Sequence, residues 1–319
     1  MQKPVSISVD IGGTNTRVAL CEDGEVLTET IQRYRNAEHP ALEPILDAYL
    51  ANYPMVAAIC IDMAGPVKDG VGTLTNLDWT IDAGALSART GGARVAVLND
   101  LQAQGHSVAH LSADSLLTLL PGQPAPEASV RLVVNVGTGL NAVPVHTSGA
   151  LTLVPAAEAG HITLQARDAL ELRLLEWLCA RIPSAGLEEV LSGRGLEHLH
   201  AFVCADEGAG TPLDAAGIMA AFTAGDAQAV RAARLFTSYL GRYCGDLSLT
   251  NLPFGGVYLV GGVAKHLGPH LMNLGFAEAF RDKGRFAQFM EQFPVHLVTD
   301  DYAALRGCAA HLAELQRAA

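Results

Sequence analysis

Five short patterns rich in glycine and polar residues occur along the chain in a fixed order. Three of them are glycine turns next to apolar, strand-like runs, and such turns let backbone N–H groups close on phosphate oxygens. The other two bring together acids, an amide and an imidazole, which suit the binding of hydroxyl groups. The patterns predict a phosphate-transferring enzyme with a polyhydroxy substrate; they are Asp10-Ile11-Gly12-Gly13-Thr14-Asn15, Asn99-Asp100, Gly137-Thr138-Gly139, Glu158-Ala159-Gly160-His161 and Gly261-Gly262.

Asp100 is the candidate catalytic base. It follows the apolar run Val95–Leu98, so we expect it at the carboxyl end of a buried strand, where the ligand sites of α/β proteins lie. A carboxylate there can accept the proton of an attacking hydroxyl group. Asn99 could hydrogen-bond another hydroxyl of the same substrate. The structural alternatives are that Asp100 is the N-cap of a helix starting at Leu101 and that Asn99 is a turn residue.

The glycine turns are candidate nucleotide sites. Glycine allows a close backbone approach to phosphate, and threonine adds a hydroxyl group. An acid before the first turn, Asp10, could hold Mg²⁺, most simply through water, because Mg²⁺ keeps several waters. The alternative is that the first two turns are ordinary β-hairpin turns and that the third serves strand–helix packing. The candidate residues are Asp10, Gly12, Gly13, Thr14, Asn15, Gly137, Thr138, Gly139, Gly261 and Gly262.

Strands and helices must alternate to position these patterns, and this alternation predicts the α/β class with parallel buried strands. Both halves of the chain start with a strand, a glycine turn and a second strand. We expect a domain boundary near residues 100–115. The predicted strands are 5–9, 17–21, 56–63, 95–98, 131–136, 142–145, 257–260 and 295–298, and the predicted helices are 40–53, 101–111, 168–182, 227–247 and 303–315.

The composition excludes several classes of protein. The 319 residues are 50% hydrophobic and carry a net charge of −12, which argues against nucleic acid or an anionic membrane as partner. No apolar run reaches the ~20 residues of a membrane-spanning helix, and the N-terminus shows no signal-peptide pattern. The six cysteines are scattered without paired or zinc-binding spacing, so we expect a reduced, cytoplasmic protein.

Further motifs extend the pattern nearly from end to end, and with them the chain resembles a known family. It resembles the bacterial glucokinases that lack a cysteine-rich zinc motif, within the actin-like ATPase and sugar-kinase superfamily. One glycine motif alone is weak support, but six or seven in the same order are strong. Besides those above, the motifs are Leu74-Thr75-Asn76-Leu77-Asp78-Trp79, Glu188-Glu189-Val190-Leu191-Ser192-Gly193 and Phe254-Gly255-Gly256-Val257.

The resemblance implies a two-lobed actin-like ATPase (ribonuclease H-like) sugar kinase fold with an interlobe cleft. A small α/β domain would take 1–110 plus 300–319, and a large one 111–299. The implied activity is ATP-dependent phosphorylation of D-glucose to D-glucose 6-phosphate, the entry to glycolysis, with ATP and Mg²⁺ and with Asp100 as base. The resemblance also implies a homodimer that closes on its sugar.

Three further residues would surround the sugar if the resemblance holds. It places Glu158, His161 and Glu188 around the sugar ring, and Gly261 and Gly262 beside the adenosine. Acceptors and donors suit a ring of hydroxyls, because a misplaced hydroxyl leaves buried polar groups unpaired. The alternatives are a core histidine or a metal-binding pair at Glu158 and His161, for which the spacing shows no third ligand. Choosing Glu188 over Glu189 depends on the family motif alone.

The chain departs from the family at a few positions, and these departures leave the identity of the sugar substrate open. Asn141 and Ala159 stand where the family usually has glycine; Asn tolerates a positive φ if the position needs one. Trp79 is expected to be a core or cleft-lining aromatic residue. The open alternatives are a kinase for fructose, mannose or an amino sugar, a sugar-independent actin-like ATPase, and a non-catalytic sugar sensor. The sequence also leaves open whether ATP, ADP or polyphosphate is the donor.

Overall fold

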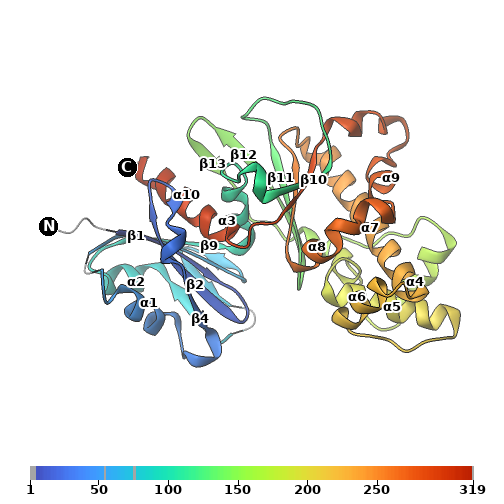
Figure 1. Ribbon diagram of the computed structural model, residues 1–319, viewed down its shortest axis with the longest axis horizontal. Helices are drawn as coiled ribbons and strands as arrows, with labels where there is room; N and C mark the ends of the chain where they lie inside the picture. The colour runs from blue at the N-terminus through green and yellow to red at the C-terminus, as the bar shows by residue number, and fades with distance from the viewer. Residues whose placement is uncertain (1–4, 54, 75–76, 318–319) are drawn as a thin grey trace. The chain divides into compact units, whose positions relative to one another are not determined.

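The chain folds into two α/β units, each with its own sheet (Figure 1). Unit 1 comprises Met1–Ala113, Thr147–Pro155 and Asp300–Ala319, and unit 2 comprises Asp114–His146 and Ala156–Thr299. The computed structural model describes residues 5–53, 55–74 and 77–317. Among these described residues, no helix is both long and apolar enough to cross a membrane.

The sheet of unit 1 has the strand order β3-β2-β1-β5-β9, with β4 also paired to β2. Strands β1, β5 and β9 are parallel, so their carboxyl ends meet at one edge, whereas β2 returns antiparallel to β1 after the first glycine turn. A separate small antiparallel sheet has the order β6-β7-β8. The bounds are β1 Val5–Ile11, β2 Asn15–Glu22, β3 Glu25–Val26, β4 Gln32–Arg35, β5 Val56–Met63, β6 Val67–Lys68, β7 Val71–Thr73, β8 Thr80–Asp82 and β9 Arg94–Asn99.

Helices cover both faces of this sheet (Figure 1). The helices α1 (Leu42–Leu50) and α2 (Ala83–Arg89) share one hydrophobic core with Ile7, Val9 and the other side chains of that face. The helices α3 (Asp100–Ser107) and α10 (Ala303–Arg317) share a second core with the opposite face. Because both faces are covered, the parallel strands are apolar almost throughout.

The segment Thr147–Pro155 belongs to unit 1, although the expected division placed it in the large domain 111–299. Its strand β13 (Leu151–Leu153) contacts α10. The Thr152 N–H donates to Glu314 Oε2 at 3.2 Å, and Gln102 Nε2 donates to the Val154 carbonyl at 3.1 Å. These polar contacts to α3 and α10 tie the segment to unit 1, and a pattern of hydrophobic residues could not reveal them.

The sheet of unit 2 repeats the plan of unit 1. Strand β11 is followed by a glycine turn and the antiparallel strand β12, while β14 and β15 lie parallel to β11. Strand β10 pairs antiparallel with β15. The bounds are β10 Leu116–Leu120, β11 Arg131–Val136, β12 Leu140–Ser148, β14 Val257–Val260 and β15 Val295–Val298.

Helices pack around the single large core of unit 2. The 25-residue helix α7 contributes Phe236, Tyr239 and Tyr243 to that core and contacts α5, α6 and α9. Asp226 caps its first turn by accepting from the N–H groups of Gln228 and Ala229. The bounds are α4 Ala169–Cys179, α5 Gly193–Glu207, α6 Ala215–Thr223, α7 Ala227–Asn251, α8 Gly262–Leu267 and α9 Phe276–Arg281.

Most predicted elements are present, and four of the predicted strands have their expected bounds. Strands β5, β11, β14 and β15 match the predictions residue for residue. The elements that were not predicted have a short or weak hydrophobic periodicity; they are β4, β6, β7, β8, β10, β13, α2, α5, α6 and α9. Trp79 is 5% exposed and lies in a core of unit 1, as predicted, whereas Asn76 of the same motif lies outside the described residues.

Candidate active site

Three acids lie together at the carboxyl edge of the unit 1 sheet. Asp10 on β1 is in register with Asp62 on β5, and Leu98 on β9 continues that row, so that Asp100 follows just beyond it. The charges of Asp10 and Asp100 both act on the Asp62 carboxyl. The edge is therefore rich in acidic side chains, and it is the place where ligand sites of parallel sheets lie.

Asp62 is the acid of this group that is fully buried. Its Oδ2 atom accepts a hydrogen bond from Cys308 Sγ at 3.4 Å, while Oδ1 has no hydrogen-bond partner among the described residues. Burial raises the pKa of the Asp62 carboxyl well above its usual range, and the charges of Asp10 and Asp100 raise it further. Asp62 therefore favours the neutral form, which limits the charge repulsion at this edge.

Asp10 is buried beside a cation. Its Oδ2 atom accepts a hydrogen bond from Arg17 Nη1 at 2.7 Å, across the hairpin of β1 and β2. The second carboxylate oxygen is the one that could face a hydrated ion. Carboxylate oxygens are the donors that Mg²⁺ takes from proteins, usually with several waters retained. The donor chemistry of this edge thus fits a magnesium ion.

Asn99, rather than Asp100, is the N-cap of helix α3. Asn99 Oδ1 accepts from the Gln102 N–H at 2.7 Å, and Gln102 Oε1 accepts from the Asn99 N–H at 3.2 Å, which forms a capping box. Asp100 is the first residue of the helix, and its Oδ1 accepts from the Leu101 N–H at 2.8 Å. The interpretation of Asp100 as an N-cap is therefore wrong. Because Asn99 Oδ1 serves the cap, the amide NH₂ is the part of the Asn99 side chain that could bind a substrate hydroxyl, as a donor.

The first glycine turn joins β1 to β2 as a tight hairpin. The Gly12 N–H donates to the Asn15 carbonyl at 3.0 Å, while Gly13 and Thr14 at the tip are exposed. Buried Asn36 supports the turn from outside: its Nδ2 donates to the Gly12 carbonyl at 2.8 Å, and its N–H donates to the Thr14 carbonyl at 3.0 Å. Asn36 thus holds the turn through the carbonyl groups of Gly12 and Thr14, on either side of Gly13.

The second glycine turn joins β11 to β12 and meets two further elements of unit 2. The Gly137 N–H donates to the Gly139 carbonyl, and the Gly193 N–H at the start of α5 donates to the Gly137 carbonyl, both at 2.9 Å. A Cβ on Gly137 would lie 3.8 Å from the Gly262 nitrogen at the start of α8. The structure therefore brings the Gly137-Thr138-Gly139 turn beside the Gly261-Gly262 turn.

The protein's own packing requires only some of these glycines. Gly261 has a φ of +99°, and a Cβ there would lie 2.5 Å from the Val136 carbonyl, so strand–helix packing alone explains it. By contrast, Gly12, Gly137 and Gly262 lie outside the positive-φ region, and a Cβ would meet no atom closer than 3.4 Å. The fold does not demand glycine at these three positions, and a close approach to a ligand does explain it.

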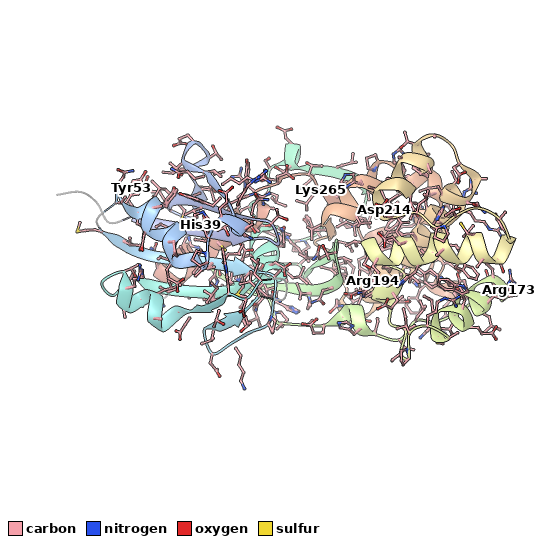
Figure 2. All side chains as sticks on the ribbon, turned by 90° about the horizontal axis from the view of Figure 1, so that it is seen from below. His39, Tyr53, Arg173, Arg194, Asp214 and Lys265 are labelled. Carbon is pink, nitrogen blue, oxygen red and sulfur yellow. The ribbon has the colours of Figure 1, made fainter. Side chains whose placement is uncertain are left out.

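Glu188 is bonded to the second glycine turn. It lies in the 3₁₀ helix η5 (Leu187–Glu189), and its Oε2 accepts from the Leu140 N–H at 2.9 Å. Its Oε1 lies 3.3 Å from a guanidinium nitrogen of Arg194, which also pairs with Glu189 at 3.0 Å. Arg194 stands at the start of α5 and is labelled in Figure 2. Glu188 therefore couples η5 to the turn.

Glu158 and His161 have exposed side chains; Glu158 directly precedes the 3₁₀ helix η4 (Ala159–His161), and His161 is its last residue. A Cβ on Gly160 between them would lie 1.9 Å from the Leu140 carbonyl, so this segment packs directly on β12. The helices η4 and η5 are in contact, and a Cβ on Gly186 would lie 3.3 Å from the His161 Cα. Glu158, His161 and Glu188 therefore lie in one region of unit 2, and His161 is not a core histidine.

Asn141 holds the same segment in place, and it does not have a positive φ. Asn141 lies in the extended strand β12. Its Oδ1 accepts from the Ala159 N–H at 2.9 Å, and its Nδ2 donates to the Ala157 carbonyl at 2.5 Å. The Tyr243 hydroxyl of α7 donates to the Ala159 carbonyl at 3.1 Å. The amide thus serves the loop that carries Glu158.

Three residues of this region were not predicted from the sequence: Asp62, Asn36 and Arg194. The available signal for Asp62 was its position as the single acid in the apolar run Val56–Met63. Burial of a carboxylate costs free energy, so such an acid suggests a specific role. Asn36 gave no signal, because it contacts a turn that is distant in the sequence. Arg194 gave no signal, because it lies in helix α5, which was not predicted.

The sequence and the fold resemble known proteins over almost their full lengths. Residues 7–315 match the family described as Glucokinase. A glucokinase of Erwinia tasmaniensis is 33% identical over 309 residues, which are 95% of this chain and 95% of that protein. The crystal structure of a glucokinase from an Antarctic psychrotroph is 31% identical, with a TM-score of 0.87 over 98% of this chain and 99% of that one.

A more distant structure shares the fold. The crystal structure of a ROK family glucokinase from Streptomyces griseus, in complex with glucose and AMPPNP, is 23% identical, with a TM-score of 0.62 over 98% of this chain and 99% of that one.

Proposed function

The chain belongs to the glucokinase family and has the α/β actin-like ATPase fold of sugar kinases, and on this premise we propose that it transfers the γ-phosphoryl group of ATP to the 6-hydroxyl of D-glucose. The products are ADP and D-glucose 6-phosphate. Glucose and an ATP analogue are both bound in the related Streptomyces griseus glucokinase, which supports this pair of substrates.

The observation that carries the nucleotide part of the proposal is the set of glycines that the fold does not require. Gly12, Gly137 and Gly262 could each hold a side chain without a close protein contact. Each stands at a turn at the carboxyl end of a strand, where backbone N–H groups can face a ligand. Phosphate groups suit such a site, because their oxygens accept hydrogen bonds from backbone N–H groups that no side chain covers.

Asp100 is the general base in this proposal. Its carboxylate takes the proton of the 6-hydroxyl as that oxygen attacks the γ-phosphorus in line, and the bond from phosphorus to the ADP oxygen breaks. Its place at the first residue of α3 fixes its backbone, because the Asn99–Gln102 capping box holds the helix start. Burial raises the pKa of Asp62, which favours its neutral form and limits the repulsive charge beside Asp100.

Sugar recognition falls to Asn99, Glu158, His161 and Glu188. The exposed Glu158 and His161 offer an acceptor and a donor to ring hydroxyls, and Asn99 offers its amide NH₂. Glu188 also accepts from Leu140 at the phosphate turn, so a sugar hydroxyl bound to it would be coupled to the nucleotide region. A sugar with one hydroxyl misplaced leaves one of these groups unpaired.

The nucleotide would contact two glycine turns and the start of α8. Gly12, Gly13, Thr14 and Asn15 form the turn in unit 1, and Gly137, Thr138, Gly139, Gly261 and Gly262 form the two adjacent turns in unit 2. Asp10 would hold Mg²⁺ through water. When bound, Mg²⁺ neutralises part of the charge on the phosphate oxygens.

The family resemblance also supports a homodimer and a cytoplasmic location. Sedimentation of the untagged protein tests the first, and a cellular fractionation tests the second.

The decisive experiment for the function measures ADP release from Mg-ATP with different sugars. Glucose, fructose, mannose, N-acetylglucosamine and no sugar are compared side by side. The proposal predicts release that depends strongly on glucose. Equal ADP release without sugar would contradict the kinase assignment, and preference for another sugar would contradict glucose as the substrate and direct attention to Ala159 and Glu188.

A further inference from the structure

Unit 1 contains a cluster of three potential metal ligands on the side of the sheet covered by α3 and α10. His106 lies in the last turn of α3, and His311 and Glu314 lie three residues apart on one face of α10. One potential ligand atom from each residue lies within 4.8 Å of those of the other two. The centroids of the two imidazole rings, those of His106 and His311, are 4.4 Å apart.

The polar atoms of this cluster are incompletely satisfied. Among the described residues, the Nδ1 atoms of His106 and His311 are buried without a hydrogen-bond partner. His106 Nδ1 lies 3.8 Å from Glu314 Oε2, which is beyond hydrogen-bond distance, and that oxygen accepts only from the Thr152 N–H at 3.2 Å among the bonds of the described chain. Buried nitrogens that lack a partner are costly unless something binds them.

The protonation states favour a metal ion over a proton. Burial lowers the pKa of His106 to about 3 and also lowers the pKa of His311, so both imidazoles are neutral at neutral pH. Neutral imidazole is the form that ligates metals. No lysine or arginine of the described residues makes an ion pair with Glu314, which is 7% exposed. A divalent cation would supply the charge that this buried carboxylate lacks.

We propose that His106, His311 and Glu314 form a binding site for one divalent transition-metal ion of the Zn²⁺ class. Two imidazole nitrogens and one carboxylate oxygen suit Zn²⁺ better than Mg²⁺ or Ca²⁺, which take oxygen ligands. A tetrahedral zinc site with bonds of about 2.0–2.1 Å needs ligand atoms about 3.4 Å apart, so the side chains need only small rotations. His311 is half-buried, whereas His106 and Glu314 are buried.

The ion would join α3 to α10, two helices in extensive contact. Helix α3 starts at Asp100, and Glu314 also holds strand β13 through Thr152. The site therefore stabilises unit 1 behind the acidic edge, without a role for the ion in the reaction. This inference does not depend on the proposed function, and binding, rather than activity, tests it.

Calorimetric titration with Zn²⁺ tests the site. The protein is untagged, freed of metals with a chelator that is then removed, and kept free of Mg²⁺ and nucleotide. We expect one equivalent of Zn²⁺ to bind, a higher melting temperature with Zn²⁺, and the visible absorption bands of a tetrahedral site when Co²⁺ replaces it. Absence of stoichiometric Zn²⁺ binding would overturn the proposal.

Single-residue variants locate the bound ion. His106→Gln and Glu314→Gln should each weaken Zn²⁺ binding by at least about 10-fold, the scale seen even for partners outside the coordination shell. The matched control is His146→Gln, because His146 is exposed and lies in unit 2, and this change should leave binding unchanged. If the His106 variant does not fold, the half-buried His311→Gln takes its place. Undiminished binding in the ligand variants, or loss of binding in the control, would contradict the assignment.

Discussion

Single residues in the glycine turns differ in what requires them. Gly160 and Gly261 are explained by packing, because a Cβ would lie 1.9 Å and 2.5 Å from a carbonyl oxygen. Gly12, Gly137 and Gly262 have no such contact and no positive φ. This contrast separates glycines that serve the fold from glycines that leave space for a ligand, and it leads to a direct prediction.

Gly137→Ala should impair ATP binding with little effect on folding. The added methyl group would meet no protein atom closer than 3.5 Å, but it would stand where a phosphate approaches the backbone. We expect KM for ATP to rise at least about 10-fold, the equivalent of ~1.4 kcal/mol, with a melting temperature close to that of the unmodified protein. Gly84→Ala in α2 is the control. An unchanged KM for ATP would contradict the phosphate role of this turn.

Asp62→Asn should stabilise the protein at neutral pH. The pKa of Asp62 is raised above its ordinary value of 3.8, so its favourable contribution to folding is complete below about pH 4 and is lost as the pH rises. Asparagine carries no charge and avoids that loss. The difference in melting temperature should therefore grow between pH 4 and pH 8, by about 2–4 °C for each kcal/mol.

Thermal unfolding in the presence of a chelator measures this difference without interference from metal ions. Asp114→Asn, a change at an exposed acid, should show no such trend. A difference in melting temperature that does not change with pH would contradict a raised pKa of Asp62.

At the scale of elements, the buried parallel strands were the most predictable part of the fold. Strands such as β5 and β14 are continuous apolar runs ended by polar or glycine residues, and their bounds matched. Helices α5 and α6 were missed, because their patterns are interrupted by glycine and histidine. The contacts of Asn36, Asn141 and the His106 cluster join distant segments, which one sequence does not reveal.

Asn141→Ala tests how the loop that carries Glu158 is held. The change removes two hydrogen bonds between the Asn141 amide and the backbone of Ala157 and Ala159. Each such bond contributes about 1 kcal/mol, so we expect KM for glucose to rise about 10-fold while KM for ATP stays nearly constant. Equal changes in both constants would show that Asn141 has no specific role in positioning the sugar loop.

At the scale of the whole molecule, the charge of −12 opposes the approach of an anionic nucleotide. The carboxylates of Asp10 and Asp100 at the acidic edge add to this repulsion locally. Backbone N–H groups carry only partial charges, so a divalent ion must offset the rest. In the proposed reaction, Mg²⁺ would therefore neutralise phosphate charge as well as position the nucleotide.

Removal of Mg²⁺ should abolish turnover with ATP. In excess EDTA we expect at least a ~10²-fold loss, the usual scale for one electrostatic contribution to phosphoryl transfer, and full recovery when Mg²⁺ is added back. The assay follows glucose 6-phosphate directly. Turnover that persists in EDTA would show that the turns and side chains alone balance the phosphate charge.

The central claim, that Asp100 is the base of a glucose kinase, is tested most directly by Asp100→Asn. The turnover number and the dissociation constant for glucose are measured on the same preparation. Asparagine keeps the size and the hydrogen-bonding shape but cannot take the proton, so we predict a loss of at least ~10² in kcat with glucose binding retained. Near-normal turnover in this variant would contradict the account.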